Sequence, residues 1–332
     1  MYLTKSFFLG IIFLICVFGL NAQTLKFNSD KKFKIVQFTD VHWKSGKAES
    51  KVSEMCMIKV LDEEKPDLVV FTGDFVNDKP AAKGVDELLQ PTLTRNIPFA
   101  MTFGNHDDED DMTRHELFDL IKRYIGSLIN TEEGISGLSN YILTVESSSD
   151  DKDAAVLYFF DSNSYSKREE TKGYDWIKTD QINWYISESK KFAEKNNGNP
   201  LPALAFFHIP LPEYNEAASD ENAKLIGTRR EKACSPVINT GLFAAMLNCG
   251  DVMGTFVGHD HVNDYAVYWK GIMLCYGRFT GSKNTYYDIP GGNGARVIEL
   301  TEGERGFKSW IRLHDGKVIN EIVYPEDFKK KD

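Results

Sequence analysis

The sequence has little cysteine, and what it has shows no disulfide or metal-binding framework. Five of the 332 residues are cysteine and no two have CxxC spacing. Cys16 lies in an N-terminal apolar stretch, which leaves Cys56, Cys234, Cys249 and Cys275. An oxidising compartment would permit these four to pair, but three of them lie in apolar segments, so we expect free thiols. A small disulfide-stabilised scaffold is excluded.

The sequence also lacks an excess of basic residues. Its 39 lysines and arginines are outnumbered by 49 aspartates and glutamates, which gives a formal net charge of -10. Nucleic acids and anionic membrane surfaces attract basic patches, so neither is expected as the main partner. A small molecule is the better expectation.

Long apolar runs are missing except at the N-terminus. Lys5 precedes the uncharged run 6–20, and Ala22 supplies a small residue at a cleavage point. This pattern predicts a secretory signal peptide at residues 1–22 and an exported (periplasmic or secreted) protein without a membrane span. The alternative is an uncleaved N-terminal membrane anchor, although the run is shorter than a comfortable span of about 20 residues. No repeat or long linker divides residues 23–332, which we expect to form one domain.

The first third of the chain alternates strand-like and helix-like segments. A helix is expected at about Ser50–Glu64, where Val52, Met55, Ile58 and Leu61 are spaced by three. Buried strands are expected at Phe33–Thr39, Asp67–Thr72 and Pro98–Phe103. This alternation predicts parallel strands joined by right-handed crossovers.

The remainder of the chain is richer in strands. A helix is predicted at Thr179–Glu194. Strands are predicted at Tyr141–Glu146, Ala154–Phe160, Pro202–Phe207, Gly254–Val257, Asp264–Trp269, Ile272–Tyr276, Arg296–Leu300 and Phe307–Leu313. The expected architecture is therefore an α/β domain with two packed sheets.

Polar side chains follow these strands at their carboxyl ends, where open α/β sheets build their sites. They include five of the seven histidines in the chain. Any one of them alone has an ordinary structural explanation, such as a capped turn or a hydrogen-bonded core histidine. The whole set is Asp40, His42, Asp74, Asn105, His106, His208, His259 and His261.

The chemistry of the set indicates a metal centre. Imidazole together with carboxylate and amide oxygen suits Mn, Fe, Zn or Ni, whereas calcium takes oxygen ligands alone. With one carboxylate shared, the set provides about four ligands for each of two ions about 3.5–4 Å apart, the spacing of two-metal hydrolytic sites. Such a pair lowers the pKa of a bound water and binds a phosphoryl oxygen, so we expect hydrolysis of a phosphate ester.

As an ordered pattern from about Phe33 to Leu300, these motifs resemble the calcineurin-like metallophosphoesterase family. The stretches 174–177, 181–185, 258–265 and 276–281 are similar to its purple-acid-phosphatase-like branch. The resemblance implies a four-layer α/β/β/α sandwich of two mixed sheets. Asn77 stands where true purple acid phosphatases have a metal-binding tyrosine, so their colour and strict Fe(III) requirement are not implied.

The resemblance also implies a role for each residue. Asp40, His42 and His261 would hold the first metal, and Asp74 would bridge the two. Asn105, His208 and His259 would complete the second site. His106 would face the substrate, where it stabilises the transition state or protonates the leaving group, and Asp107 would orient its ring. A positioned donor of this kind is worth roughly 10²–10⁴ in rate.

Two further expectations concern residues near this set. Arg278 is a candidate for contacting a substrate phosphate, because guanidinium binds such oxygens in a bidentate way. Asp108 to Asp111 are expected to form a solvated approach to a helix that begins near Met112, with no part in the chemistry. His115 and His314 are assigned no role.

The sequence therefore predicts an exported dinuclear-metal phosphoesterase that cleaves phosphate esters by attack of a metal-activated hydroxide. A phosphomonoesterase is favoured. The alternatives are a phosphodiesterase acting on a small diester and a non-catalytic binder of a phosphorylated ligand. A binder is disfavoured because it has no need of a positioned donor such as His106.

Overall fold

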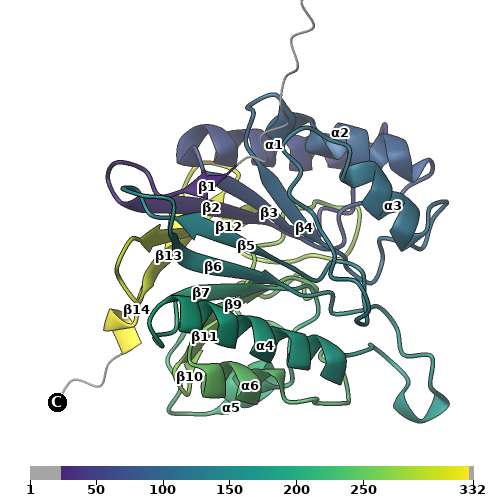
Figure 1. Cartoon of the computed structure of the whole chain (residues 1–332). Helices are drawn as coiled ribbons and strands as arrows, with labels where there is room; N and C mark the ends of the chain where they lie inside the picture. Colours follow the sequence, from purple (N-terminus) through teal and green to yellow (C-terminus); the bar gives the residue numbers. More distant parts are fainter. Residues whose placement is uncertain (1–23, 329–332) are drawn as a thin grey trace, which may run out of the picture.

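The structure, a computed structural model, describes residues 24–328, so the predicted signal peptide lies outside the described residues. Two β-sheets pack face to face, and helices cover the outer face of each (Figure 1). The predicted four-layer α/β/β/α sandwich is confirmed. Within residues 24–328 no helix combines the length and the hydropathy that a membrane crossing requires.

The first sheet has six strands and carries the N-terminal crossovers. Strands β2, β3 and β4 run parallel, as the alternation of segments predicted, and the other neighbours are antiparallel. In spatial order the strands are β14 (Val318–Tyr324), β13 (Phe307–Leu313), β12 (Gly294–Thr301), β2 (Lys32–Phe38), β3 (Leu68–Thr72) and β4 (Phe99–Thr102). Its outer face is covered by α1 (Ala48–Glu64), α2 (Ala81–Leu93) and α3 (Arg114–Ile121).

The second sheet has eight strands, of which β6, β7, β9 and β11 form a parallel centre. In spatial order the strands are β1 (Leu25–Lys26), β5 (Tyr141–Glu146), β6 (Asp153–Phe159), β7 (Ala203–Phe206), β9 (Val252–Val257), β11 (Ile272–Tyr276), β10 (Ala266–Trp269) and β8 (Leu225–Ile226). Helices α4 (Thr179–Lys195), α5 (Glu213–Ser219) and α6 (Leu242–Cys249) cover its outer face. The 3₁₀ turns are η1 (Glu169–Thr171) and η2 (Glu326–Phe328).

The two sheets are joined by apolar packing and by buried polar side chains, of which Gln37 is an example. Phe256 of β9 and Phe307 of β13 pack across the interface with ring centroids 5.6 Å apart. The Gln37 Nε2 of β2 donates to the Thr72 hydroxyl at 2.8 Å and to the Val257 carbonyl of the opposite sheet at 3.0 Å. Because a buried amide must keep its partners, Gln37 holds the ends of β3 and β9 in register.

The buried face of α1 differs from the one that the sequence suggested. Val52 and Met55 are 47% and 68% exposed, whereas Cys56, Met57, Val60 and Glu64 are buried. Glu64 accounts for part of the difference, because its carboxylate accepts from Trp310 Nε1 at 2.9 Å and from Arg312 Nε at 2.7 Å on β13. Polar pairing therefore helps to set which face of this helix meets the sheet.

The four cysteines within the described residues are all free, in agreement with the expectation of free thiols. Cys56 and Cys275 are buried in the core, Cys249 is half-buried and Cys234 is exposed. The domain therefore holds its fold without a disulfide among these residues.

Candidate metal centre

The predicted ligands lie two to four residues after the last residue of five strands. Asp40 and His42 follow β2, Asp74 follows β3 and Asn105 follows β4 in the first sheet. His208 follows β7, and His259 and His261 follow β9 in the second. Because both sheets end at the same edge, the structure brings together residues more than 200 positions apart.

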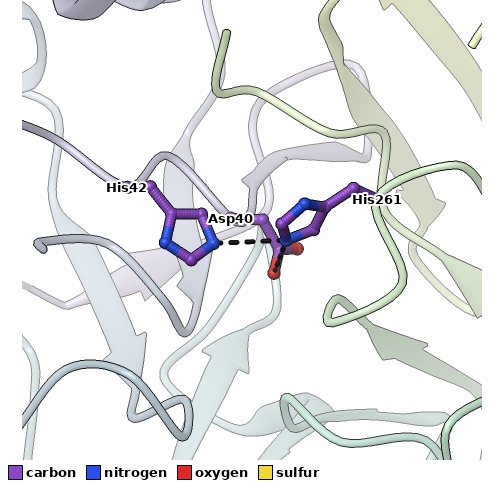
Figure 2. A group of neighbouring side chains, drawn as sticks. All are labelled: Asp40, His42 and His261. Carbon is purple, nitrogen blue, oxygen red and sulfur yellow. Dashed lines mark hydrogen bonds and ion pairs between the residues drawn. The ribbon is translucent and has the colours of Figure 1, made fainter. Parts of the chain in front are cut away.

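Asp40, His42 and His261 form the first group of potential ligands (Figure 2). His261 Nε2 lies 3.2 Å from His42 Nε2 and 3.5 Å from Asp40 Oδ1. His261 Nδ1 lies 2.9 Å from the Tyr286 carbonyl, which can only accept, so the neutral ring carries its proton on Nδ1 and its lone pair on Nε2. Two imidazole nitrogens and a carboxylate that converge in this way suit a cation.

Asp74, His208 and His259 form the second group. His208 Nε2 lies 3.1 Å from Asp74 Oδ2, and His208 Nδ1 donates to the Thr72 carbonyl at 2.7 Å. The same Asp74 Oδ2 lies 3.8 Å from His42 Nε2 in the first group. The Asp74 carboxylate thus stands between the two groups, where the bridging ligand was predicted.

The second group passes a simple test of whether its residues fit a metal ion. Asn105 Oδ1 and His259 Nε2 are both buried and have no hydrogen-bond partner. A buried polar atom without a partner costs about 1–3 kcal/mol, so such atoms call for an explanation. An ion held by Asp74 and His208 would use both, which matches the predicted ligand set.

Four of the predicted ligands have a left-handed backbone. The φ angles of Asp40, His42, Asp74 and His259 are 52°, 46°, 51° and 80°. Residues other than glycine adopt this region rarely, and such strain gathers at functional sites. The sharp turns direct each side chain from its strand end into the shared space.

Two glycines permit the close approach of these turns. A Cβ atom at Gly104 would overlap the carboxylate of Asp74, and a Cβ atom at Gly258 would overlap the Thr39 hydroxyl and crowd Asp40. Their φ values lie outside the left-handed range, so space and not backbone conformation requires glycine here. Close packing therefore explains why glycine precedes Asn105 and His259 in the sequence.

Burial and mutual charge set the ionisation of the site. Burial lowers the pKa of His42 and of His259 to about 3, so both imidazoles are neutral and can bind metal. Burial opposes protonation of His208 too, but the charges of Asp74 and Asp40 outweigh it and raise its pKa to about 10. A metal ion at the second group must therefore displace a proton from His208.

His106 lies beside the two groups without belonging to either. Its ring centroid is 5.6 Å from that of His42, and its side chain is 36% exposed. Its Nδ1 lies 2.6 Å from Glu109 Oε2, which fixes the ring and leaves Nε2 available. A half-exposed imidazole next to buried ligands is suited to meet a substrate.

The predicted role of Asp107 is wrong. Its carboxylate accepts from the backbone N–H groups of Gly104 at 2.7 Å, Phe75 at 2.8 Å and Asp74 at 3.1 Å. Glu109, and not Asp107, contacts the His106 ring. Asp107 is buried because it organises the turns after β3 and β4, and a residue adjacent to His106 in sequence points away from it.

The interpretation of the acidic run also needs correction. Glu109 was expected to be a solvated bystander and is instead the partner of His106. Asp111 accepts from the Ala81 N–H at 2.8 Å and so caps α2, which is distant in sequence. The helix begins at Arg114, where Thr113 and Glu116 form a capping box, two residues later than predicted.

Arg278 cannot reach a substrate. Its side chain is fully buried and pairs with Asp264 Oδ2 at 2.5 Å, and the guanidinium also donates to the carbonyls of Pro290 and Gly292. With both its charge and its N–H groups satisfied inside the protein, Arg278 holds the loop that follows β11 in place. The substrate-binding prediction for this residue is therefore wrong.

We expect the substitution Arg278→Met to lower the free energy of unfolding by about 3–5 kcal/mol, because it leaves the carboxylate of Asp264 buried and unpaired. The exposed pair of Arg95 with Asp62 provides a control, and Arg95→Met should cost no more than about 1 kcal/mol. Denaturant unfolding of the metal-free proteins measures both values. If Arg278→Met retained its stability and had a raised KM, the substrate-binding prediction for Arg278 would be supported.

Tyrosines at the mouth of the site were not assigned a role from the sequence. Tyr174 meets the His259 ring at a centroid distance of 4.3 Å, Tyr286 stacks on His261 at 4.5 Å, and the Tyr165 hydroxyl accepts from Asn105 Nδ2 at 2.8 Å. All three lie in loops, where no hydrophobic period marks them. Only the fold shows that these loops return to the metal ligands.

Fold and site together define a metallophosphoesterase. The family model for calcineurin-like phosphoesterases matches residues 33–263, and the chain belongs to this family. Within the family it is similar to proteins named as purple acid phosphatases. "Probable inactive purple acid phosphatase 29" of Arabidopsis thaliana is 34% identical over 95% of this chain and 91% of its own length.

Two further similarities agree with this placement. "Phosphatase DCR2" of Saccharomyces cerevisiae is 35% identical over 88% of this chain and 56% of its own length. Among solved structures, a dimetal phosphatase from Danio rerio has a TM-score of 0.61 at 13% identity, over 88% of this chain and 98% of that one. At such low identity the structural likeness supports the fold alone.

Proposed function

We propose that this protein is a metal-dependent phosphoesterase that hydrolyses small phosphate monoesters. One observation carries the proposal: two buried groups of three ligands share an edge of the fold, Asp74 stands between them, and the half-exposed His106 lies alongside. Two bound metal ions would supply positive charge for the phosphoryl oxygens and would lower the pKa of a water molecule. The identity of the ions is left open among Mn, Fe, Zn and Ni.

The side chains of the protein supply the rest of the chemistry. The Nδ1 of His106 is held by Glu109, so the proposal assigns to Nε2 the protonation of the leaving-group oxygen or a hydrogen bond to a phosphoryl oxygen. Asp40 and Asp74 are maintained as carboxylates, because the neighbouring imidazoles hold the pKa of each below its usual range in spite of burial. His42 and His259 provide neutral nitrogen ligands, and His208 would become one when a metal ion displaces its proton.

The charge around the site favours a small substrate over a long polyanion. Within residues 24–328, none of the seven predicted metal ligands is hydrogen-bonded or ion-paired to a lysine or arginine side chain. The chain as a whole carries a net charge of -10. A long polyanion such as a nucleic acid would be repelled, whereas this charge does not separate a small monoester from a small diester.

The name of the Arabidopsis relative contains the words "probable inactive", so a non-catalytic function is the rival proposal. A binder of phosphorylated ligands would need the metal groups but no positioned imidazole beside them. The present chain has both ligand groups together with His106 and its Glu109 partner. This combination supports catalysis over binding.

We also propose that the protein is exported. The support is the sequence pattern of residues 1–22, with a basic residue, an uncharged apolar run and a small residue in order. An N-terminal anchor is the alternative. Fractionation of cells that express the full chain, with N-terminal sequencing of the product, separates the two.

Metal analysis and parallel assays test the catalytic proposal. The purified protein, loaded in turn with Mn, Fe, Zn or Ni, is assayed on p-nitrophenyl phosphate and on bis(p-nitrophenyl) phosphate. We expect about two ions for each chain and faster cleavage of the monoester. Faster cleavage of the diester would make the protein a phosphodiesterase, and no cleavage of either ester with metal bound would support the non-catalytic alternative.

A further inference from the structure

A hairpin-like loop that contains none of the predicted metal ligands reaches them. Residues 164–175 lie between β6 and α4, and Tyr165 pairs with Tyr174 in an antiparallel bridge. The loop is closed by hydrogen bonds from Ser166 N to the Gly173 carbonyl and from Asp175 N to the Ser164 carbonyl, both 2.9 Å. In Figure 1 it projects, with η1 at its tip, from the edge of the molecule where α4 begins.

The base of this loop packs on two predicted ligands of the second metal. The Ser164 hydroxyl donates to the Asn105 carbonyl at 3.1 Å, and the Asn105 Nδ2 donates to the Tyr165 hydroxyl at 2.8 Å. Tyr174, stacked on Tyr165 with centroids 5.7 Å apart, meets the His259 ring. Both the backbone and the side chain of Asn105 are therefore held by this loop.

The orientation of the Asn105 amide decides whether it can bind a metal. An amide offers an oxygen that can coordinate a cation and an NH₂ group that cannot. With Nδ2 bound to Tyr165, Oδ1 is the atom left without a partner, although the side chain is fully buried. In the reverse orientation the NH₂ group would occupy the position of Oδ1 and no oxygen would be available to a metal ion.

Glu109 selects one of the two orientations. A tyrosine hydroxyl can donate or accept, so alone it would tolerate either end of the amide. Glu109 lies near enough for its charge to act on the Tyr165 hydroxyl: burial first, and then this charge, raise the pKa of the tyrosine. Because a nearby carboxylate attracts the hydroxyl proton, a lone pair of the Tyr165 oxygen is left to accept from Asn105 Nδ2.

We propose that Tyr165 is a positioning residue, whose hydroxyl fixes the Asn105 amide with its oxygen available to the second metal ion. The proposal rests on the dimetal centre of the proposed function. It adds a requirement that the ligand set itself does not contain: the loop 164–175, which supplies no ligand, must be docked for the second site to reach full affinity. Tyr165 itself is 43% exposed and remains at the mouth of the site.

The substitution Tyr165→Phe tests the proposal because it removes only the hydroxyl. Tyr174→Phe is the matched control: it makes the same change in the same loop, and the Tyr174 hydroxyl has no hydrogen bond among the described residues. Stepwise dissociation constants for Zn²⁺ are measured by competition with a chromogenic chelator. Loss of a partner that orients a ligand typically weakens metal binding about 10- to 100-fold.

We expect Tyr165→Phe to weaken one of the two Zn²⁺ sites by about 10- to 100-fold and to leave the other unchanged, while Tyr174→Phe binds as the wild type does. In an Asn105→Ala background, Tyr165→Phe should have no further effect on either constant. Wild-type constants for Tyr165→Phe, or equal weakening of both sites, would overturn the proposal. If the wild-type protein binds no Zn²⁺, the proposed function fails first, so the two failures are distinguishable.

Discussion

Replacement of Asp74 by asparagine should strip both metal ions from the protein and reduce kcat/KM by about 10³-fold or more. A neutral amide cannot bridge two cations, and without them the site loses several kcal/mol of charge stabilisation, each 1.4 kcal/mol of which is a factor of about ten in rate. Asparagine keeps the size of the side chain and can still accept the His106 N–H, which Asp74 Oδ1 binds at 2.9 Å. Metal content and steady-state kinetics on p-nitrophenyl phosphate measure the effect.

Asp119→Asn is the matched control, because this substitution makes the same chemical change at an exposed position of α3. This variant should keep both ions and full activity. A variant Asp74→Asn that retained two ions would show that Asp74 does not bridge them. The assignment of the two ligand groups to a shared centre would then fail.

The second large effect is expected for His106→Ala, which should keep both ions while kcat falls by about 10²–10⁴-fold. Metal is retained because His106 belongs to neither ligand group. Activity falls because the substitution removes the half-exposed imidazole of His106. This ring is held beside the centre by its Nδ1 contact to Glu109 Oε2 at 2.6 Å. Metal analysis together with kinetics on p-nitrophenyl phosphate separates the two effects.

His115→Ala provides the comparison, since His115 is an exposed histidine at the start of α3. It should leave both metal content and kcat unchanged. If His106→Ala loses metal, the residue acts as a ligand. If it retains both metal and kcat, no donor is needed at this position and the assigned role is wrong.

The fold was predictable from the sequence to a large extent, because its strands follow simple rules. The runs that became β2, β3 and β4 are short, apolar and separated by helical segments, and this pattern indicates parallel pairing without knowledge of the partner. The strand β14 was missed. It is an edge strand whose residues are mostly half-buried or exposed, so hydrophobicity hardly marks it.

The ligand groups were predictable for a related reason. Polar residues directly after buried strands must gather at one edge, so Asp40, Asp74 and His208 could be placed together before any distance was known. The family resemblance gave Asp40, His42 and His261 to one metal, Asn105, His208 and His259 to the other, and Asp74 to both. The structure forms two groups of three potential ligands, with Asp74 in the group of His208 and His259.

The contacts of individual side chains could not be predicted, because they depend on loops. Asp107 and Glu109 are two residues apart in one acidic run, yet one binds backbone amides and the other binds His106. Arg278 follows a strand as the ligands do, but its guanidinium turns inward to Asp264. Sequence position indicates which edge a residue reaches and not the direction in which its side chain points.

The origin of each ligand group in both sheets has a consequence for the lifetime of the protein. His261 from the second sheet joins Asp40 and His42 from the first, and Asp74 from the first joins His208 and His259 from the second. An ion in either group would therefore act as a clamp across the seam between the sheets, and binding to the folded state alone stabilises that state. Scarcity of metal would then reduce the abundance of the protein through proteolysis of the opened sandwich, in addition to lowering the turnover of each molecule.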